Sequence, residues 1–375
     1  MSGQFGLRLS GLVASLRASL RENPWLVVAV LICLFGLTYN FSGYALLEPD
    51  EGRNAEVARE IAASNDYVLP HLNGLPYLDK PIFFFAAGAI AMEVLGPTVL
   101  AARLPSLVFT VATLTLVGWF GNRLLGKHGG WIAVIATAAT PFTLAYSRTV
   151  IFDSTVTFFI VLALMSFYLA FESAETRDAA RVTKPSASTK PSGSGWTIVA
   201  WAAMAFGVLT KGPIALAVPL MVAVPFMLWR RQWRAVLDPL SVIVFVALIA
   251  PWVFAVLRQV PDFLHYVLVT ETAQRLTTDE LQRTGPFWYF LAILPAAALP
   301  WSVIALASWR SLAWRDRYGN MDGRIVYLLL WIVVPLIFFS LSQSKRPQYV
   351  LPLVPAIAML VAAAWHSRPK CLPGA

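Results

Sequence analysis

Eleven long apolar runs constrain this chain more than any other feature of its sequence. They fall near residues 25–46, 81–96, 101–122, 129–147, 154–171, 196–210, 212–229, 239–257, 286–309, 325–344 and 347–365. A helix needs about 20 residues to cross a hydrocarbon core of ~30 Å, and in lipid only helices and closed barrels satisfy their backbone groups. The runs are rich in Leu, Ala and Val and lack the alternation of barrel strands. The sequence therefore predicts an all-α polytopic membrane protein.

Composition supports this fold class. Hydrophobic residues make up 58% of the chain and charged residues 13%, whereas a soluble domain carries about 25% charged residues. The net charge of +9 is explained by its distribution around the runs, so no nucleic-acid partner is expected. The two cysteines form no metal-ligand spacing, and the first run is too long for a cleaved signal peptide.

The positive-inside rule sets the topology. The run 81–96 is short and ends at Gly96-Pro97, so we expect it to lie along the outer interface as an amphipathic helix. With the other ten runs crossing, 18 of the 29 Lys and Arg residues fall inside, and the net charge is +11 inside and −2 outside. Letting 81–96 cross would weaken this bias.

This assignment of ten membrane crossings, the ten-span threading, divides the chain into segments. We expect a cytoplasmic N-terminus over 1–24 and a membrane domain over 25–365, including an extracytoplasmic loop over 47–100 with a short helix near Arg53–Ser64. The segment 172–195 ends in a stretch rich in Pro, Ser, Gly and Lys, which predicts a flexible cytoplasmic linker. A cytoplasmic tail over 366–375 follows, and we expect no C-terminal soluble domain.

Six polar clusters lie at the ends of apolar runs, and the threading places all six on the outer side. They are Glu48–Arg53, Asp79-Lys80-Pro81, Arg148 with Asp153, Lys211, His265 with Glu271, and Lys345–Tyr349. A polar channel would instead place charges along a path through the midplane. The arrangement favours an active site at the lipid–water boundary.

The first two clusters each have an ordinary reading and a chemical one. Asp50 is either part of a solvated loop or a partly desolvated carboxylate with the basicity of a general base, and Arg53 is suited to bind a phosphate. Asp79 and Lys80 either start a helix in the usual way or form an anion site with its N-terminus.

The next clusters lie close to hydrocarbon. Arg148 and Asp153 share a short turn, where Asp153 either caps the next helix or is paired and functional. Lys211 lies between two apolar runs, and only Gly212 and Pro213 separate it from the second run. Its ammonium therefore either reaches a lipid headgroup or binds a lipid-borne phosphate.

The last two clusters differ in strength. His265 and Glu271 are six residues apart, which does not place them on one helical face, and an amphipathic loop explains them as well. Lys345, Arg346 and Tyr349 bring two cations and a phenol to a membrane exit, which suits a pyrophosphate or phosphate headgroup or a charged turn. No Gly-rich phosphate loop, catalytic triad or zinc-ligand spacing is present.

Taken in order, the motifs resemble those of a known family of membrane enzymes. They are Glu48-Pro-Asp-Glu-Gly-Arg53, Leu78-Asp-Lys-Pro81, Ala101-Ala-Arg-Leu-Pro-Ser106, Ser147-Arg148 with Asp153, Leu209-Thr-Lys-Gly-Pro213 and Lys345-Arg-Pro-Gln-Tyr-Val-Leu-Pro352. From about residue 25 to 365 the chain is similar to the protein O-mannosyltransferase superfamily, near the branch of the lipid A aminoarabinose transferases.

The resemblance implies a GT-C-type membrane fold and a glycosyltransferase that uses a polyprenyl-phosphate sugar donor at the periplasmic face of the bacterial inner membrane. By resemblance Asp50 and Asp153 are the catalytic acids. The positions that hold the donor phosphate or line the cavity are Arg53, Lys80, Lys211, Lys345 and Tyr349, with His265 and Glu271 matching less well. Arg148 joins them as a candidate from its turn beside Asp153. Relatives often have Glu where this chain has Asp79, which leaves a divalent metal there open.

We therefore expect transfer of a pentose or hexose, with aminoarabinose as one candidate, from undecaprenyl phosphate to lipid A, another envelope lipid or glycan, or a protein. A transporter or flippase of lipid-linked sugars is the alternative. It predicts charges near the midplane and internal repeats, and neither is visible in the sequence. A scaffold subunit would not need six ionisable clusters on one face.

Overall fold

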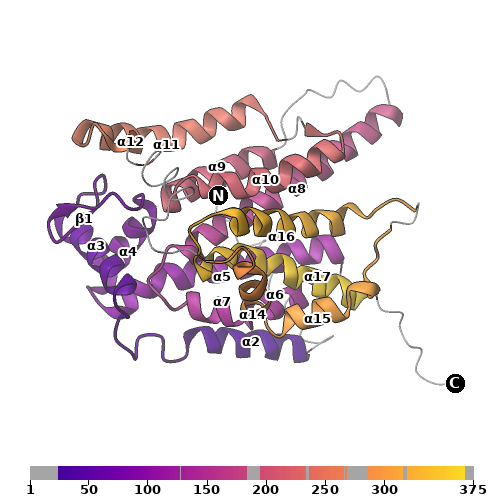
Figure 1. Ribbon diagram of the computed structural model, residues 1–375, viewed down its shortest axis with the longest axis horizontal. Helices are drawn as coiled ribbons and strands as arrows, with labels where there is room; N and C mark the ends of the chain where they lie inside the picture. The colour runs from indigo at the N-terminus through magenta and orange to yellow at the C-terminus, as the bar shows by residue number, and fades with distance from the viewer. Residues whose placement is uncertain are drawn as a thin grey trace, which may run out of the picture.

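The computed structural model describes residues 24–126, 128–183, 195–233, 236–265, 267, 285–315 and 319–367. These residues form a helical bundle with one two-stranded hairpin (Figure 1). The first half contains α2 (Pro24–Thr38), α3 (Asp50–Ser64), β1 (His71–Leu72), β2 (Leu75–Pro76), α4 (Phe83–Leu95), α5 (Val99–Leu125), α6 (Gly129–Ala138), α7 (Pro141–Tyr146) and α8 (Asp153–Thr183). The second half contains α9 (Gly195–Lys211), α10 (Ile214–Trp229), α11 (Pro239–Gln259), α12 (Phe263–His265), α14 (Tyr289–Ala297), α15 (Trp301–Ala307), the 3₁₀ turns η3 (Trp309–Ser311) and η4 (Pro347–Leu353), α16 (Gly323–Leu341) and α17 (Val354–Ser367).

Every predicted apolar run contains at least one helix, so the all-α membrane fold is confirmed. Among the described residues, five helices are long and apolar enough to cross a bilayer. The pair α14–α15, bent by 102°, would add a sixth if it forms one span. Five shorter apolar helices are α2, α4, α6, α9 and α10. The ten-span threading, with α4 along the outer interface, stays a prediction.

The centre of the bundle is built from α8 and the η4–α17 segment. In each, 89% of the most apolar window is buried inside the protein. Aromatic rings fill the space beside α8, where Tyr168 and Phe226 pack against Tyr327. The Tyr327 hydroxyl donates to the carbonyl oxygen of Leu164 at 2.6 Å, so this phenol is satisfied without water.

Two helices at the periphery expose most of their apolar side chains. Only 11% of the α11 window is buried, and α2 exposes large residues such as Leu31, Ile32 and Phe35. In Figure 1, α2 and α11 lie on opposite sides of the bundle. Exposed apolar faces on this scale are expected where lipid is the solvent, so both helices present a lipid-facing surface.

A small unit formed by α3, α4 and the hairpin lies at one end of the bundle (Figure 1). Its own apolar core includes Val57, Ile61 and Phe85, together with Val150 and Phe152 from the turn before α8. The predicted helix near Arg53–Ser64 is therefore confirmed, although α3 begins earlier, at Asp50. This unit brings the turn before α8 against the start of α3.

The opposite end of α8 carries a second set of charges. Glu172 pairs with Arg123 of α5 at 3.1 Å, Glu175 pairs with Arg230 after α10, and the Asp178 carboxylate accepts from Gln232 at 2.6 Å. At 1.5 Å per residue, the stretch from Asp153 to Glu172 spans ~28 Å, close to the hydrocarbon thickness of about 30 Å. The two charged ends of α8 are thus one membrane thickness apart.

These pairs also correct one prediction. The segment 172–195 was expected to be a flexible linker, but α8 continues through it to Thr183. Carboxylates along this helix are held by Arg123 of α5 and by Arg230 and Gln232 of the segment after α10, and the helix extends beyond its apolar part. Residues 184–194, which include the Pro/Ser-rich stretch, lie outside the described residues, as do the tail residues 368–375 and the N-terminal residues 1–23.

Candidate active site

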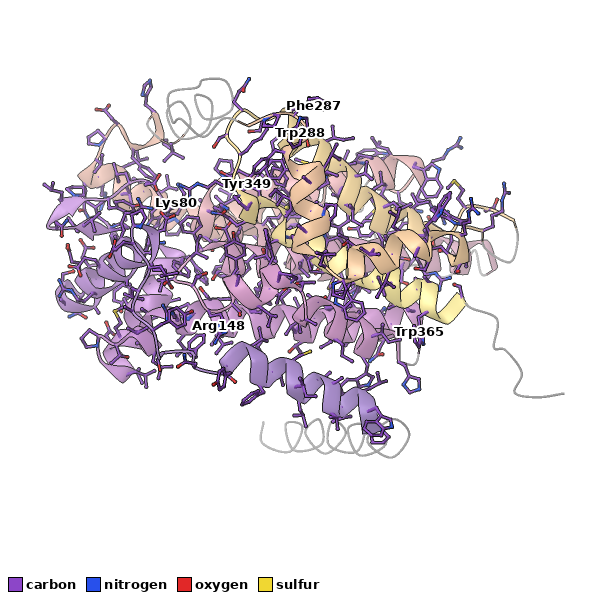
Figure 2. The ribbon with its side chains drawn as sticks, turned by 60° about the horizontal axis from the view of Figure 1, so that its bottom comes forward. Lys80, Arg148, Phe287, Trp288, Tyr349 and Trp365 are labelled. Atoms are coloured by element: carbon purple, nitrogen blue, oxygen red, sulfur yellow. The ribbon has the colours of Figure 1, made fainter. Side chains whose placement is uncertain are left out.

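A cavity of about 210 Å³ lies where α8, the α9–α10 junction, α16 and η4 meet the segment before α4. Its polar lining includes Asp79, Lys80, Asp153, Lys211 and Tyr349. These residues come from four of the six clusters that were predicted to share one membrane face. Figure 2 labels Lys80 and Tyr349, which the cavity brings together across 269 positions of sequence.

The cavity continues into an apolar part. Its walls there are Val156, Ile160, Ile214, Ala217, Phe338, Phe339 and Pro352, from α8, α10, α16 and η4. The charged part of the lining thus stands beside an extended apolar wall, and Ser342, Ser344 and Gln348 add uncharged polar groups. A ligand with an anionic head and an apolar chain matches this division.

Asp153 and Lys211 form a buried ion pair at the centre of the polar part. Asp153 is the first residue of α8, Lys211 is the last of α9, and the Lys211 ammonium contacts Asp153 Oδ1. Gly212, with φ +85°, allows the chain to turn directly after Lys211 into α10. The turn places the ammonium beside the start of α8.

The environment of this pair is almost dry. Asp153 is 2% exposed, and the Lys211 ammonium lies 5.4 Å from the ring centre of Phe152 and 4.7 Å from that of Tyr349. The second carboxylate oxygen of Asp153, Oδ2, is buried and has no hydrogen-bond partner among the described residues. Buried polar atoms are nearly always bonded, so Oδ2 is an acceptor available to a bound ligand.

Lys80 brings a second ammonium to the same place. Its Nζ lies 2.9 Å from Asp79 Oδ1 and 5.8 Å from the ring centre of Phe152. The Tyr77 hydroxyl donates to Asp79 Oδ2 at 3.0 Å. Burial, followed by the negative charge of Asp79, raises the pKa of Tyr77, so this phenol stays a donor. Lys80 and Lys211 therefore flank Phe152 with two cations.

Asp50 lies apart from the lining of this cavity. Its side chain is 42% exposed. It contacts the guanidinium of Arg53, one turn along α3, through Oδ1, and Arg346 Nη1 lies 3.9 Å from its Oδ2. Arg346 directly precedes η4, so this contact joins the small α3–α4 unit to the bundle that holds the cavity. Arg346 is one of the two cations of the Lys345–Tyr349 cluster that are predicted to suit a phosphate headgroup, and its described ion-pair partner is Asp50.

Lys345 and Arg148, which are predicted to contact the substrate, instead bind backbone carbonyls. The Lys345 ammonium donates to the carbonyl oxygens of Ser340 at 3.0 Å and Ser342 at 2.5 Å, which belong to the end of α16. Carbonyls in a last helical turn lack intrahelical partners, which explains this capping contact. Burial also lowers the pKa of Lys345. Lys345 does not line the cavity.

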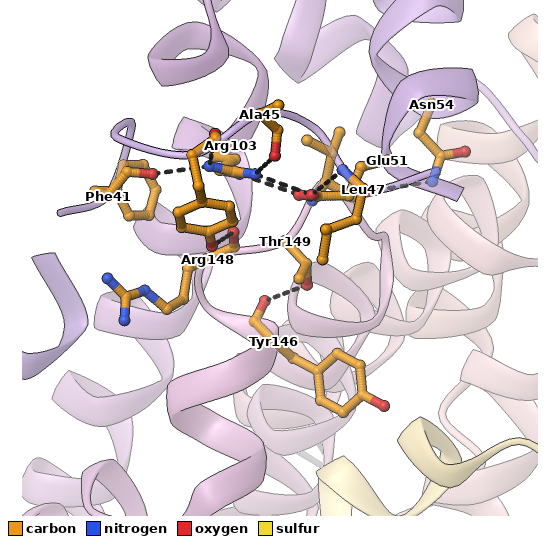
Figure 3. A network of polar contacts seen from close by, with 11 residues as sticks. Phe41, Ala45, Leu47, Glu51, Asn54, Arg103, Tyr146, Arg148 and Thr149 are labelled. Atoms are coloured by element: carbon orange, nitrogen blue, oxygen red, sulfur yellow. Dashed lines mark hydrogen bonds and ion pairs between the residues drawn. The ribbon is translucent and has the colours of Figure 1, made fainter. Parts of the chain in front are cut away.

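Arg148 points toward α2 instead of the cavity (Figures 2 and 3). Its guanidinium donates to the carbonyl oxygen of Tyr39, just after the end of α2. Here too the reason is an unpaired carbonyl at a helix end. His265 is exposed on α12, while its neighbour Phe263 lines the cavity. Glu271 lies outside the described residues.

The donor set at Asp79 does not fit a metal site. Among the described residues, no group of three or more His, Cys, Asp and Glu side chains could hold a metal ion. Asp79 is a single carboxylate whose two oxygens already face Tyr77 and Lys80. We therefore derive no step through a metal at this position.

Comparisons with known proteins identify the family of this chain. Residues 57–267 match the family model described as dolichyl-phosphate-mannose-protein mannosyltransferase. The undecaprenyl phosphate-alpha-4-amino-4-deoxy-L-arabinose arabinosyl transferase of Erwinia tasmaniensis is 35% identical over 321 residues, covering 85% of this chain and 55% of the relative. The corresponding protein of Pseudomonas aeruginosa is 31% identical over 345 residues, covering 91% of this chain and 60% of the relative. The chain thus spans little more than half the length of these curated relatives.

Solved structures give the same result for the fold. ArnT from Cupriavidus metallidurans bound to undecaprenyl phosphate superposes with a TM-score of 0.78 at 26% identity, over 91% of this chain and 60% of that one. The oligosaccharyltransferase of Archaeoglobus fulgidus, at 14% identity, matches in fold with a TM-score of 0.58 over 92% of this chain and 51% of that one. The predicted GT-C-type fold is confirmed. The chain belongs to the dolichyl-phosphate-mannose-protein mannosyltransferase family.

Proposed function

We propose that this chain is a glycosyltransferase that moves a sugar from a polyprenyl-phosphate donor to an acceptor at the outer face of the bacterial inner membrane. The observation that carries the proposal is the buried Asp153–Lys211 pair beside Lys80, at the charged part of a cavity that also has an extended apolar wall. Relatives named as undecaprenyl phosphate-aminoarabinose arabinosyl transferases support the donor class, as does a similar solved structure that is bound to undecaprenyl phosphate.

In this proposal the two ammonium groups bind the donor phosphate. The bond between the anomeric carbon and the phosphate oxygen breaks, and the electron pair leaves with the polyprenyl phosphate. Negative charge grows on that oxygen, and preorganised cations in a dry site stabilise such charge strongly. Lys211 and Lys80 supply these cations, while the prenyl chain occupies the apolar part of the cavity.

The carboxylates act on the sugar. Positive charge develops at the anomeric carbon as the donor bond breaks, and Asp153 Oδ2, which has no other described partner, can accept from the sugar or stabilise that charge. The acceptor oxygen attacks from the opposite face and inverts the configuration. If the acceptor is a hydroxyl, its proton passes to Asp50 as general base. If it is a phosphate of lipid A, already ionised, Asp50 orients the acceptor instead.

The acceptor side faces the periplasm in this proposal. The charges gathered at the Asp153 end of α8 form the outer end, and those around Glu172 form the cytoplasmic end, in agreement with the positive-inside bias of the sequence. Asp50, at the edge of the small α3–α4 unit, is then open to an outer-leaflet acceptor such as lipid A. A different envelope lipid, glycan or protein would meet the same carboxylate.

Mass spectrometry of lipid A and envelope glycans tests the proposal in cells. Strains that lack the gene, carry the wild-type gene, or carry Asp50→Asn are compared. We expect one mass increment of a pentose or hexose that appears only with the wild-type gene. Identical spectra in the three strains would contradict it, and accumulation of the unused donor on the cytoplasmic side would point to a flippase.

A further inference from the structure

A second ion pair, between Glu51 and Arg103 (Figure 3), involves no residue that lines the cavity. Glu51 follows Asp50 in the first turn of α3, and Arg103 lies in the first half of α5. Arg103 Nε and Nη2 donate to the two carboxylate oxygens of Glu51 at 3.1 Å and 2.9 Å. Arg103 is 0% and Glu51 4% exposed, so this two-point contact is fully buried.

The rest of the guanidinium is used by the segment between α2 and α3. Nη1 donates to the carbonyl oxygens of Phe41 at 3.1 Å and Tyr44 at 3.2 Å, and Nη2 donates to that of Ala45 at 3.0 Å. The guanidinium also lies 3.8 Å from the ring centre of Tyr44. All five N–H donors of the arginine are thus occupied, and the chain leading to Asp50 is folded around them.

The Glu51 carboxylate joins a third segment to this arrangement. It accepts from the amide of Leu47 at 2.8 Å and from the amide of Val150 at 2.8 Å. Leu47 lies three residues before Asp50, and Val150 lies three residues before Asp153. The same turn is held from two further sides, because Asn54 donates to the Val150 carbonyl at 2.8 Å and Ser106 donates to the Ile151 carbonyl at 3.2 Å.

Burying such a pair brings little net stability. The cost of removing two charges from water offsets most of their attraction, and a well-packed apolar pair often serves equally well. A fully bonded buried network does, however, fix one arrangement of the segments it joins. The geometric effect of the Glu51–Arg103 pair is therefore its distinctive consequence here.

We infer that Glu51 and Arg103 are positioning residues that set the placement of Asp50 relative to Asp153. One carboxylate holds the backbone before each of these residues, and one guanidinium holds that carboxylate against α5. The inference rests on the proposed function, since it assigns the two aspartates to one reaction. It gives Glu51 a role distinct from that of a general base, because all its described hydrogen bonds are made inside the protein.

The test uses the full chain in lipid nanodiscs, with Glu51→Gln and Arg103→Lys. Three quantities are measured: kcat with a polyprenyl-phosphate sugar donor, the Kd for undecaprenyl phosphate, and amide hydrogen exchange over 45–50 and 148–152. We expect kcat to fall about 10- to 100-fold, while Kd stays within about twofold because Lys80 and Lys211 are untouched. Exchange should rise over these segments in Glu51→Gln, since the substituted amide keeps only one of the two oxygens that accept from the Leu47 and Val150 amides.

The conservative variant separates positioning from folding. Arg103→Lys keeps the positive charge but loses the planar guanidinium that donates to both Glu51 oxygens. It should therefore retain more turnover than Arg103→Met. Arg123→Met is the matched control, because it removes the other ion-paired arginine of α5, at the opposite end of the helix and 54% exposed. Its kcat should equal that of the wild type.

If the variants of Glu51 and Arg103 fail to fold, Asn54→Ala offers a milder change, because it removes only one hydrogen bond to the turn before Asp153. It should lower kcat several-fold at unchanged Kd. Unchanged kcat in folded Glu51→Gln or Asn54→Ala, despite faster exchange, overturns the inference, as does a loss of kcat and donor binding together. If the wild type itself transfers no sugar, it is the proposed function that fails. Unchanged hydrogen exchange over both segments in Glu51→Gln would refute the inference separately, because Glu51 would then not hold the two segments.

Discussion

Replacing Lys211 with methionine tests the Asp153–Lys211 pair through stability. Asp153 is 2% exposed, and Lys211 is the one cation in contact with its carboxylate among the described residues. Removing one partner of a buried pair leaves an uncompensated charge, which costs about 3–5 kcal/mol. We therefore expect Lys211→Met to lower the free energy of unfolding by that amount. Adding Asp153→Asn in the same chain removes the charge and should restore most of it.

The same two variants separate stability from binding. The Lys211 ammonium is assigned to the donor phosphate, and a hydrogen bond to a charged group contributes about 1.5–3 kcal/mol. Its loss should weaken undecaprenyl phosphate binding by roughly 10- to 150-fold. The double variant should regain stability without regaining affinity.

The assay combines denaturant unfolding with titration of undecaprenyl phosphate, both in the same nanodiscs. Arg59→Met is a suitable control, because Arg59 pairs on the surface with Glu56 within α3, and such exposed pairs contribute at most about 1 kcal/mol. If Lys211→Met binds undecaprenyl phosphate as tightly as the wild type, the reasoning is refuted. Lys211 would then serve only as the ion-pair partner of Asp153.

Three further predictions follow from the structure and the sequence. Asp50→Asn should lower turnover by about 10²-fold or more while donor affinity, measured by titration, largely survives. Burial and the bond to Glu93 raise the pKa of Tyr67 from 10.0 to about 12, so the native state keeps a proton that the unfolded chain loses. This contribution to stability is complete below pH 10 and is lost as pH rises toward 12, and unfolding of Tyr67→Phe should lack that part of the pH dependence. Reporter fusions should read periplasmic at Asn73 and cytoplasmic at Gly319, and the opposite signals would contradict the ten-span threading.

The sequence predicts the helices and the common location of the charges for one physical reason. Apolar length fixes where a helix begins and ends across a membrane, so the residues at run ends are assigned to a depth. Asp79, Lys80, Asp153, Lys211 and Tyr349 line one cavity, which that depth assignment anticipated.

The depth of a residue in the membrane does not say which way its side chain points around the helical bundle. The contacts of the other predicted site residues depend on that orientation. Lys345 and Arg346 are adjacent, yet the first caps α16 and the second faces Asp50. Arg148 shares a short turn with Asp153 but reaches α2. These outcomes depend on which unpaired carbonyl or carboxylate lies nearest in space.

The sequence does not identify the long-range ion pairs, for the same reason. Lys211 and Asp153 are 58 positions apart, and Arg103 and Glu51 are 52 apart. Each charge is visible in the sequence, but its partner is set by how the helices pack. A rule that buried charges must be paired predicts that partners exist without identifying them.

The most direct test of the central claim is transfer by the purified chain itself. The protein in nanodiscs is supplied with an undecaprenyl-phosphate-linked aminopentose and with lipid A, and donor, free undecaprenyl phosphate and lipid A are followed by mass spectrometry. The account predicts stoichiometric release of undecaprenyl phosphate with a matching mass increase in the acceptor, and loss of both in Asp50→Asn. Donor that stays intact while tightly bound, or that only moves across the bilayer of a proteoliposome, would contradict it.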